Sequence, residues 1–283
     1  MSRNAGTGLD SRPEFPHPSK RFGQHFLTDK RIIDRIIKSL APAAEETIIE
    51  VGPGRGALTA PLLEKVGMVV AVEFDRKLIP LLQENFGACE NFRLLQQDVL
   101  RTNFCAEITP ATSARIVANL PYNISTAILQ RMIEQRRCLT EAVVMLQREV
   151  VDRITAPAGT KDRGYLSVLV QAYSEVEQLF DVAPGAFRPP PKVWSSVIRL
   201  KFHSSIAVPV RNEERFWHIV SAGFRQRRKT ILNNLRQAPA PLNERIKRYG
   251  GASIVLCRAE VELNERAENL TLDDWAKICN ALE

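Results

Sequence analysis

The sequence predicts an α/β protein with a mostly parallel sheet, helices on both faces, an antiparallel strand pair at one edge and a small all-helical C-terminal part. Three observations lead to this fold class. Short apolar runs alternate with segments of helical periodicity from about residue 29 to 173. Two strand-like runs then follow without an obvious helix between them, which favours an antiparallel pair. Beyond Phe202, helical periodicity continues while the strand signal fades.

The expected elements can be placed in order along the chain. Expected strands, rich in apolar and β-branched residues, span 47–51, 68–73, 92–96, 114–119, 142–146, 176–182 and 195–202. Expected helices span 29–40, 57–66, 124–136 and 165–173, with a further one around residue 150. Asp29 is expected to cap the first of these helices, and Asp75 the helix after the second strand. In the C-terminal part we expect helices at 213–224, 230–235 and 272–282.

The length of 283 residues suits one large domain with a smaller one. Residues 1–19 are rich in Ser, Arg and Pro and are expected to form a flexible tail. The sheet domain is expected to span 20–207, and the helical domain 208–283.

Composition narrows the function classes. Hydrophobic residues make up 45% of the chain, charged residues 25%, and the net charge is +7 with a pI near 9.3. This balance favours a polyanionic partner, nucleic acid first and a membrane surface second. No apolar run approaches the ~18 residues of a membrane span, and the N-terminus lacks a signal-peptide core. The five cysteines and four histidines show no metal-ligand spacing, which argues against a zinc site and a disulfide framework and fits the cytoplasm.

The most informative motif follows the fourth expected strand. Asn119-Leu120-Pro121-Tyr122 stands at the carboxyl end of that strand, where open α/β sheets bind ligands. The amide oxygen of Asn119 and the carbonyl of Leu120 or Pro121 can each accept one hydrogen of an exocyclic amine. Tyr122 can stack on a base taken out of its helix. An asparagine before such a turn more often only stabilises the turn, so the residues at the neighbouring strand ends must distinguish this role from a catalytic one.

Two other strand ends carry matching residues. The glycine-rich turn 52–56 follows the first strand, and Gly52 and Gly54 allow close approach of a ligand. Glu73 ends the next strand about 20 residues later, where a carboxylate can accept both ribose hydroxyls. Asp98 ends the third strand. Each acid alone is better explained as a capping or solvated carboxylate, but the set favours an adenosine ligand. NAD remains an alternative, although no hydride-transfer pocket is evident, and the turn lacks the GK[ST] of a P-loop.

These motifs together resemble those of the ribosomal RNA adenine dimethyltransferases, within which the bacterial enzymes of small-subunit 16S rRNA are the most similar. The resemblance covers about residues 20–282. Besides 50–56, Glu73, 97–98 and 119–123, it includes the segments 20–27, 189–196, 224–230 and 233–235. His25 is a departure, because asparagine is expected there.

The resemblance implies a Rossmann-like fold that uses S-adenosylmethionine, with a seven-stranded sheet, and dimethylation of two adjacent adenines near the 3′ end of 16S rRNA in the assembling small subunit. It implies cofactor contacts by His25, Leu27, Gly52, Gly54, Glu73, Asp98 and Asn119, and catalytic positions at Asn119, Leu120, Pro121 and Tyr122. Phe187 is a candidate for the other face of the flipped base, with a core role equally plausible. No metal is required, and a monomer is expected.

Basic residues are candidates for RNA contact. The densest cluster comprises Arg225, Arg227, Arg228 and Lys229, and the expected active-site mouth is flanked by Lys20, Arg21, Arg188 and Lys192. The alternative for such a run of charged residues is an exposed helix face that contacts only water. Other hypotheses stay open: a 23S rRNA methyltransferase of the resistance type, an RNA-binding assembly or transcription factor with incidental methylation, and, less strongly, a DNA adenine methyltransferase.

Overall fold

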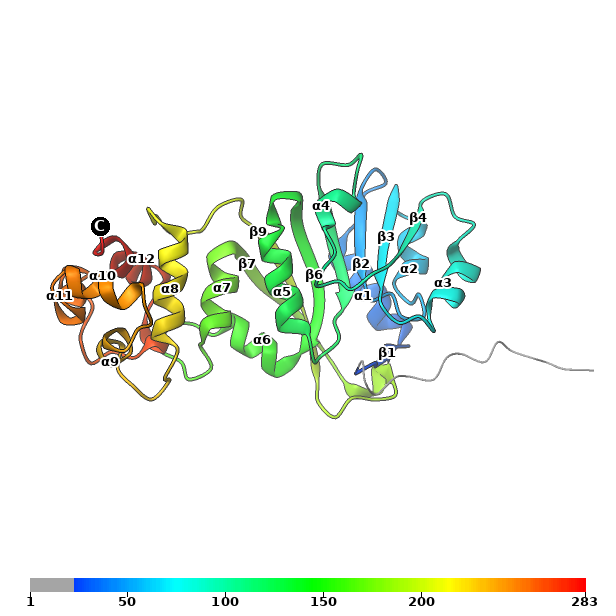
Figure 1. The fold of residues 1–283 in the computed structure, drawn as a ribbon. Helices are drawn as coiled ribbons and strands as arrows, with labels where there is room; N and C mark the ends of the chain where they lie inside the picture. The colour runs from blue at the N-terminus through cyan, green and yellow to red at the C-terminus, as the bar shows by residue number, and fades with distance from the viewer. Residues whose placement is uncertain (1–22) are drawn as a thin grey trace, which may run out of the picture.

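A computed structural model describes residues 23–283 of the chain. The expected tail, Lys20 and Arg21 therefore lie outside the described residues. A seven-stranded sheet forms the centre, in the order β4-β3-β2-β5-β6-β9-β7. In Figure 1, the β4 edge of this sheet lies beside α3 (Ile79–Phe86), and a helical bundle lies at the opposite end of the molecule.

The seven strands confirm the predicted sheet. The five parallel strands are β4 (Phe92–Gln96), β3 (Met68–Glu73), β2 (Thr47–Val51), β5 (Ala114–Asn119) and β6 (Leu139–Gln147). The predicted edge pair is also confirmed, since β9 (Ser195–Phe202) runs antiparallel to both β6 and β7 (Ser174–Val182). Because the first five strands run in one direction, β2, β3, β4 and β5 present their carboxyl ends at a common edge.

Both faces of the sheet are covered, as successive side chains of one strand show. Ile49 in β2 packs in a core with Ile128 of α5, whereas the preceding Ile48 packs with Leu40 of α1 on the other face. This alternation explains why the strands are apolar throughout. The helices of this region are α1 (Lys30–Leu40), α2 (Thr59–Leu63), α3 (Ile79–Phe86), α4 (Phe104–Glu107), α5 (Ser125–Glu134), α6 (Arg148–Thr155) and α7 (Tyr165–Tyr173).

Local sequence chemistry accounts for the helix boundaries. Asp29 caps α1 as predicted, accepting from the amide of Arg31 at 2.9 Å. Helix α2 is shorter than the expected 57–66, because the glycine-rich turn extends as non-helical turns as far as Leu58. The prediction that Asp75 caps the next helix is wrong, because the N-cap position of α3 is Leu78; Asp75 instead accepts from the amide of Lys77 at 3.0 Å in the preceding turn.

The C-terminal part is helical, as predicted. It contains α8 (Glu213–Gly223), α9 (Ile231–Arg236), α10 (Leu242–Arg248), α11 (Ala252–Arg258) and α12 (Leu272–Asn280), around the fully buried Trp275. Helices α10 and α11 were not expected from the sequence. Trp217 of α8 donates to the hydroxyl of Tyr173 at 2.7 Å, and that hydroxyl donates to Glu213. The bundle is thus joined to α7 by hydrogen bonds as well as by apolar contact.

A two-stranded ribbon lies apart from the main sheet. β1 (Phe26–Leu27) pairs antiparallel with β8 (Phe187–Arg188), and the amide of Thr28 donates to Ala186 at 2.9 Å. The strands are too short for a sequence pattern to reveal them. The ribbon joins the segment before α1 to the Pro-rich loop before β9 (Figure 1).

The cysteines are predicted to form no disulfide framework, but the structure contains one disulfide bond. Cys105 and Cys138 form one disulfide, because the turn after α5 folds back against α4. Cys89, Cys257 and Cys279 are free. Within residues 23–283 there is no group of three or more possible metal ligands, and no helix long and apolar enough to cross a membrane.

Candidate functional site

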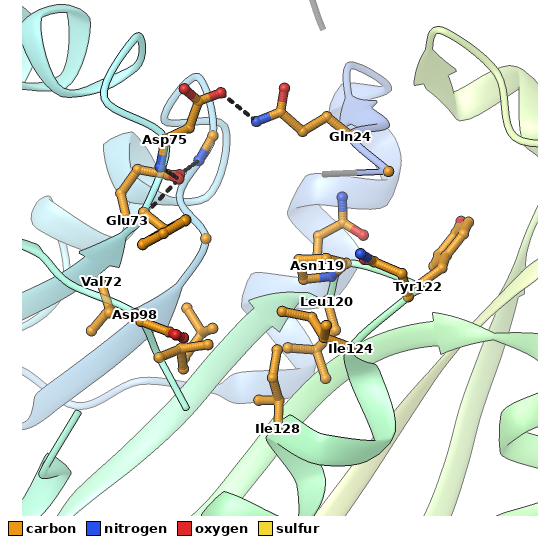
Figure 2. A pocket seen from close by; sticks show the side chains of 18 of the residues that line it. Gln24, Val72, Glu73, Asp75, Asp98, Asn119, Leu120, Tyr122, Ile124 and Ile128 are labelled. Carbon is orange, nitrogen blue, oxygen red and sulfur yellow. Dashed lines mark hydrogen bonds between the residues drawn. The ribbon is translucent and has the colours of Figure 1, made fainter. Parts of the chain in front are cut away.

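One cavity of about 350 Å³ opens at the carboxyl ends of β2, β3 and β5. Its volume falls in the range of small-molecule sites. Figure 2 shows acidic and amide side chains on its rim and apolar side chains, such as Ile124 and Ile128, below them. The cavity brings together many of the predicted site residues: His25, Gly52, Gly54, Glu73, Asp98, Asn119, Leu120, Pro121 and Tyr122.

The glycine-rich turn forms one wall of this cavity. Gly52 has φ +68°, and a Cβ added there would meet no atom within 4 Å. Gly54 has φ +60°, and a Cβ would come within 3.1 Å of the ring of Phe26. Both conformations favour glycine, so the backbone can turn sharply and leave room for a ligand beside Gly52.

Glu73 lies at the end of β3, where it is 7% exposed. One carboxylate oxygen accepts from the amides of Phe74 and Asp75 at 2.9 and 2.8 Å, and the other accepts from Gly54 at 3.3 Å. Burial raises the pKa of Glu73, and these amide hydrogen bonds oppose the shift. The carboxylate is therefore held in place and retains lone pairs for ligand hydroxyls.

Gln24 and Asp75 bridge one side of the rim. The Gln24 amide donates to the Asp75 carboxylate at 2.8 Å (Figure 2). This contact connects the segment before β1 to the end of β3. Sequence reasoning assigned neither residue to the site, because a side-chain bond across 51 residues leaves no local signal.

Asp98 lies beyond β4 on the same cavity. One carboxylate oxygen accepts from the amide of Leu100 at 3.0 Å, which fixes the side chain in a turn. The adjacent Val99 and the 56% exposed Phe74 also line the cavity. Neither was predicted, although Phe74 directly follows the predicted Glu73.

Asn119 is oriented by a backbone contact. Its side-chain nitrogen donates to the carbonyl of His25 at 3.0 Å. This assignment leaves the amide oxygen as an acceptor on the opposite side of the planar group. The carbonyl of Pro121 accepts from the amide of Ile124 at 3.2 Å, so of the two candidate carbonyls Leu120 is favoured as the second acceptor.

Tyr122 is fixed at both its ring and its hydroxyl. The hydroxyl lies 2.7 Å from the Ser195 hydroxyl, and the ring stacks on His25 with centroids 5.5 Å apart and planes inclined by 29°. The Nδ1 of His25 donates to the carbonyl of Pro189 at 2.8 Å. Burial raises the pKa of the Tyr122 phenol, which therefore stays neutral at physiological pH. The contacts of Ser195 and Pro189 were not expected.

Two predicted residues do not lie on the main cavity wall. Phe187 is 0% exposed and packs in the core with Leu27 and Ala186, which favours the core role over contact with a base. Leu27 is 5% exposed and lines a smaller adjoining cavity together with Glu50. Glu50 is 1% exposed and accepts from the Thr59 hydroxyl at 2.6 Å. Burial raises the pKa of Glu50 to about 8.

The predicted basic residues within 23–283 are exposed. Arg188 and Lys192 lie in and after β8, near the segment that contacts Tyr122 and His25. The cluster of the C-terminal part follows α8: Arg225 donates to the carbonyl of Gln237, and Arg227 to the carbonyl of Lys161. Arg228 and Lys229 are exposed beside them.

Comparison with known proteins identifies the family of this chain. The model of the family described as Ribosomal RNA adenine dimethylase matches residues 17–283. The chain belongs to this family. A ribosomal RNA small subunit methyltransferase A from Xanthomonas axonopodis pv. citri is 42% identical over 267 residues, covering 94% of this chain and 97% of the relative. The corresponding protein of Xanthomonas campestris pv. campestris (strain B100) is 41% identical over the same length.

Solved structures agree with the fold. A dimethyladenosine transferase from Plasmodium falciparum superposes with a TM-score of 0.73 at 25% identity, covering 90% of this chain and 96% of that one. The 23S rRNA methyltransferase ErmE, at 24% identity and a TM-score of 0.67, covers 91% and 99% and shares the fold. The predictions of a Rossmann-like methyltransferase fold and of an enzyme of the rRNA adenine dimethylase family are confirmed.

Proposed function

We propose that this protein transfers methyl groups from S-adenosylmethionine to the N6 amines of two adjacent adenines near the 3′ end of 16S rRNA. The observation that supports this most directly is the shared cavity. Asn119, Leu120 and Tyr122 line the same cavity as Gly52, Glu73 and Asp98. The groups that would accept hydrogen bonds from the target amine therefore lie next to those that would bind the adenosine of the cofactor. The small-subunit methyltransferase relatives supply the choice of RNA.

The cavity fits the cofactor. Gly52 leaves space for the methionine end, Glu73 offers acceptors for the ribose hydroxyls, and Asp98 offers one for the adenine amine. The exposed ring of Phe74 can cover the adenine face. When bound, S-adenosylmethionine supplies a methyl group on a positively charged sulfur.

The protein positions the target amine. The lone pair of the adenine N6 is delocalised into the ring, which makes it a poor nucleophile. Hydrogen bonds from its two hydrogens to the Asn119 side-chain oxygen and the Leu120 carbonyl would favour a pyramidal nitrogen with its lone pair directed at the methyl group. Both acceptors also stabilise the positive charge that develops on nitrogen. Because the alkylated amine is acidic, water can take its proton and no strong general base is needed.

Tyr122 holds the flipped base. Its hydroxyl is fixed by Ser195 and one ring face by His25, so the ring is preorganised for stacking. A monomethylated adenine retains one N–H, and the same site can therefore accept it for the second transfer. The exposed basic residues would contact RNA phosphates, with recognition of shape in the assembling subunit. We propose that the protein acts as a monomer in the cytoplasm.

The test is tritiated methyl transfer to three substrates: unmodified small subunits, large subunits and naked rRNA. We expect label on small subunits, recovered as N6,N6-dimethyladenosine after digestion. Label confined to large subunits would assign the enzyme to 23S rRNA instead. Absence of label on all three, with retained small-subunit binding, would favour an assembly factor without methylation.

A further inference from the structure

The loop between β8 and β9 leaves two adjacent apolar side chains exposed, directly before Ser195, which contacts the cavity residue Tyr122. Trp194 is 50% exposed and Val193 is 44% exposed, whereas the following Ser195 is buried. Only two other large hydrophobic side chains within 23–283 are comparably exposed, Phe74 and Ile254. Exposed aromatic side chains of this size favour a contact surface over a packing role.

Backbone and side-chain contacts hold this loop against the walls of the base site. The carbonyl of Trp194 accepts from the amide of Arg148 at 3.0 Å, and the next residue, Ser195, contacts the Tyr122 hydroxyl at 2.7 Å. At the other end of the loop, the Pro189 carbonyl accepts from His25. Consecutive Cα atoms lie about 3.8 Å apart, so the Cα of Trp194 lies at about this distance from the Cα of Ser195, the residue that contacts the Tyr122 hydroxyl.

Basic residues lie close to Trp194 in the chain or contact its backbone. Lys192 is exposed in the same loop, and Arg148 is half-exposed at the start of α6. Arg188 is exposed at the end of β8, where its guanidinium donates to the carbonyls of Gly185 and Phe187. Arg148 also pairs with Asp181 at 3.5 Å, which partly neutralises it. An aromatic surface with flanking cations is the arrangement that binds single-stranded nucleic acid by stacking and phosphate contact.

We propose that Trp194, supported by Val193, stacks on the RNA base next to the flipped adenine. This inference rests on the proposed function. When one of two adjacent adenines enters the pocket, its neighbour loses a stacking partner. The indole replaces that partner, and the flanking cations hold the connecting phosphates. Trp194 is then a positioning residue that presents each adenine of the pair in turn.

The first experiment measures methylation of unmodified small subunits by the full-length protein and by the variants W194A, W194F and I254A. We expect W194A to raise the KM for subunits about tenfold, since base–aromatic stacking has this order of effect. W194F should retain most of the affinity. I254A, which removes a 44% exposed apolar side chain from α11, should match the wild type. Cofactor affinity, measured by calorimetry without RNA, should be the same in all four proteins.

The second experiment uses reconstituted small subunits with an abasic nucleotide beside the target adenine. The penalty of W194A should disappear on this substrate, because the base that the indole contacts is absent. A penalty of unchanged size on the abasic subunit would overturn the inference, as would W194A with a wild-type KM on intact subunits. A matching fall in cofactor affinity would show a structural effect and also contradict it. If the wild type labels no subunit, the proposed function fails as well.

Discussion

Asn119 donates its side-chain amide to the backbone carbonyl of His25 at 3.0 Å, across 94 residues of chain. The contact assigns the two ends of the amide group different roles. The nitrogen joins β5 to the segment that includes β1, and the oxygen is left as an acceptor in the cavity. A residue that the sequence analysis selected for its oxygen thus also holds the backbone at the wall of the cavity.

Replacing Asn119 with alanine should lower kcat for small-subunit methylation by about a hundredfold or more, by analogy with loss of one oxyanion donor. The variant should still bind small subunits, since the RNA-contact residues are unchanged. The measurement is single-turnover methyl transfer together with filter binding. N243A is the matched control, because Asn243 also donates its amide to a carbonyl, that of Arg236, remote in sequence from the site. Activity of N119A near that of the wild type would refute the acceptor role.

The Tyr122–Ser195 pair should act as a unit. Y122F and S195A each remove the 2.7 Å hydroxyl contact, and we expect each to lower kcat by a few-fold. The double variant should be no worse than either single variant, because both remove the same bond. Y122A should be much slower, since it also removes the stacking face. Additive losses in Y122F/S195A would show that the two hydroxyls act separately.

Gly54 should tolerate no side chain. G54A places a Cβ 3.1 Å from the Phe26 ring at φ +60°, so we expect lower cofactor affinity and a loss of about 1 kcal/mol or more in unfolding free energy. G159A is the control: its φ is +88°, but a Cβ there meets no atom within 4 Å. It should be strained and yet bind cofactor normally. Calorimetry and thermal melts distinguish the two effects, and equal cofactor affinity in both variants would contradict the steric argument.

Glu50 should make stability depend on pH. Its pKa in the folded protein is raised to about 8 from the ordinary 4.5, so between these values the folded state binds more protons than the unfolded state. Stability should therefore fall as pH rises from about 4.5 to 8 and level off above. Each pKa unit corresponds to about 1.4 kcal/mol. E50Q keeps an acceptor for Thr59 and removes the titrating group. The difference in unfolding free energy between the wild type and E50Q, measured with urea, should therefore change with pH in this way. A difference independent of pH would contradict it.

The basic cluster after α8 should contact phosphates. R228A/K229A should weaken small-subunit binding and reduce the slope of log affinity against log salt by about one for each phosphate that is no longer bound. Cofactor binding should not change. R31A is the control, because the Arg31 side chain is 90% exposed but belongs to α1. An unaltered salt slope in R228A/K229A would assign the RNA surface elsewhere.

Much of the fold follows from local patterns in the sequence. β2, β3, β4 and β9 begin and end where predicted, because short runs rich in apolar residues define them. Helix α10 escaped prediction because it buries only Leu242 and Ile246, too few apolar positions to set a helical period, and α11 because its run Ile254-Val255-Leu256 is equally compatible with a strand. The β1–β8 ribbon has two residues per strand, and its pairing depends on tertiary contact alone.

The site was predictable where residue type and strand end coincide, as at Glu73, Asp98 and Asn119. It was not predictable where distant segments meet. The contacts of Ser195 with Tyr122, Gln24 with Asp75 and Pro189 with His25 each join residues at least 51 positions apart. Phe187 illustrates the reverse case, since an aromatic residue beside a Pro-rich loop is compatible with both a base site and a core, and only burial distinguishes them.

The β1–β8 ribbon has a consequence for the order of events during turnover. One of its strands belongs to the segment that lines the cavity proposed to bind the methyl donor, and the other leads into the loop proposed to contact RNA. Movement of either strand alone would break the pairing, so donor loading and RNA capture should favour the same arrangement of this ribbon. By thermodynamic linkage, if the methyl donor raises the affinity for RNA by some factor, RNA raises the affinity for the donor by the same factor. The binding of one substrate would thereby affect the binding of the other through the ribbon.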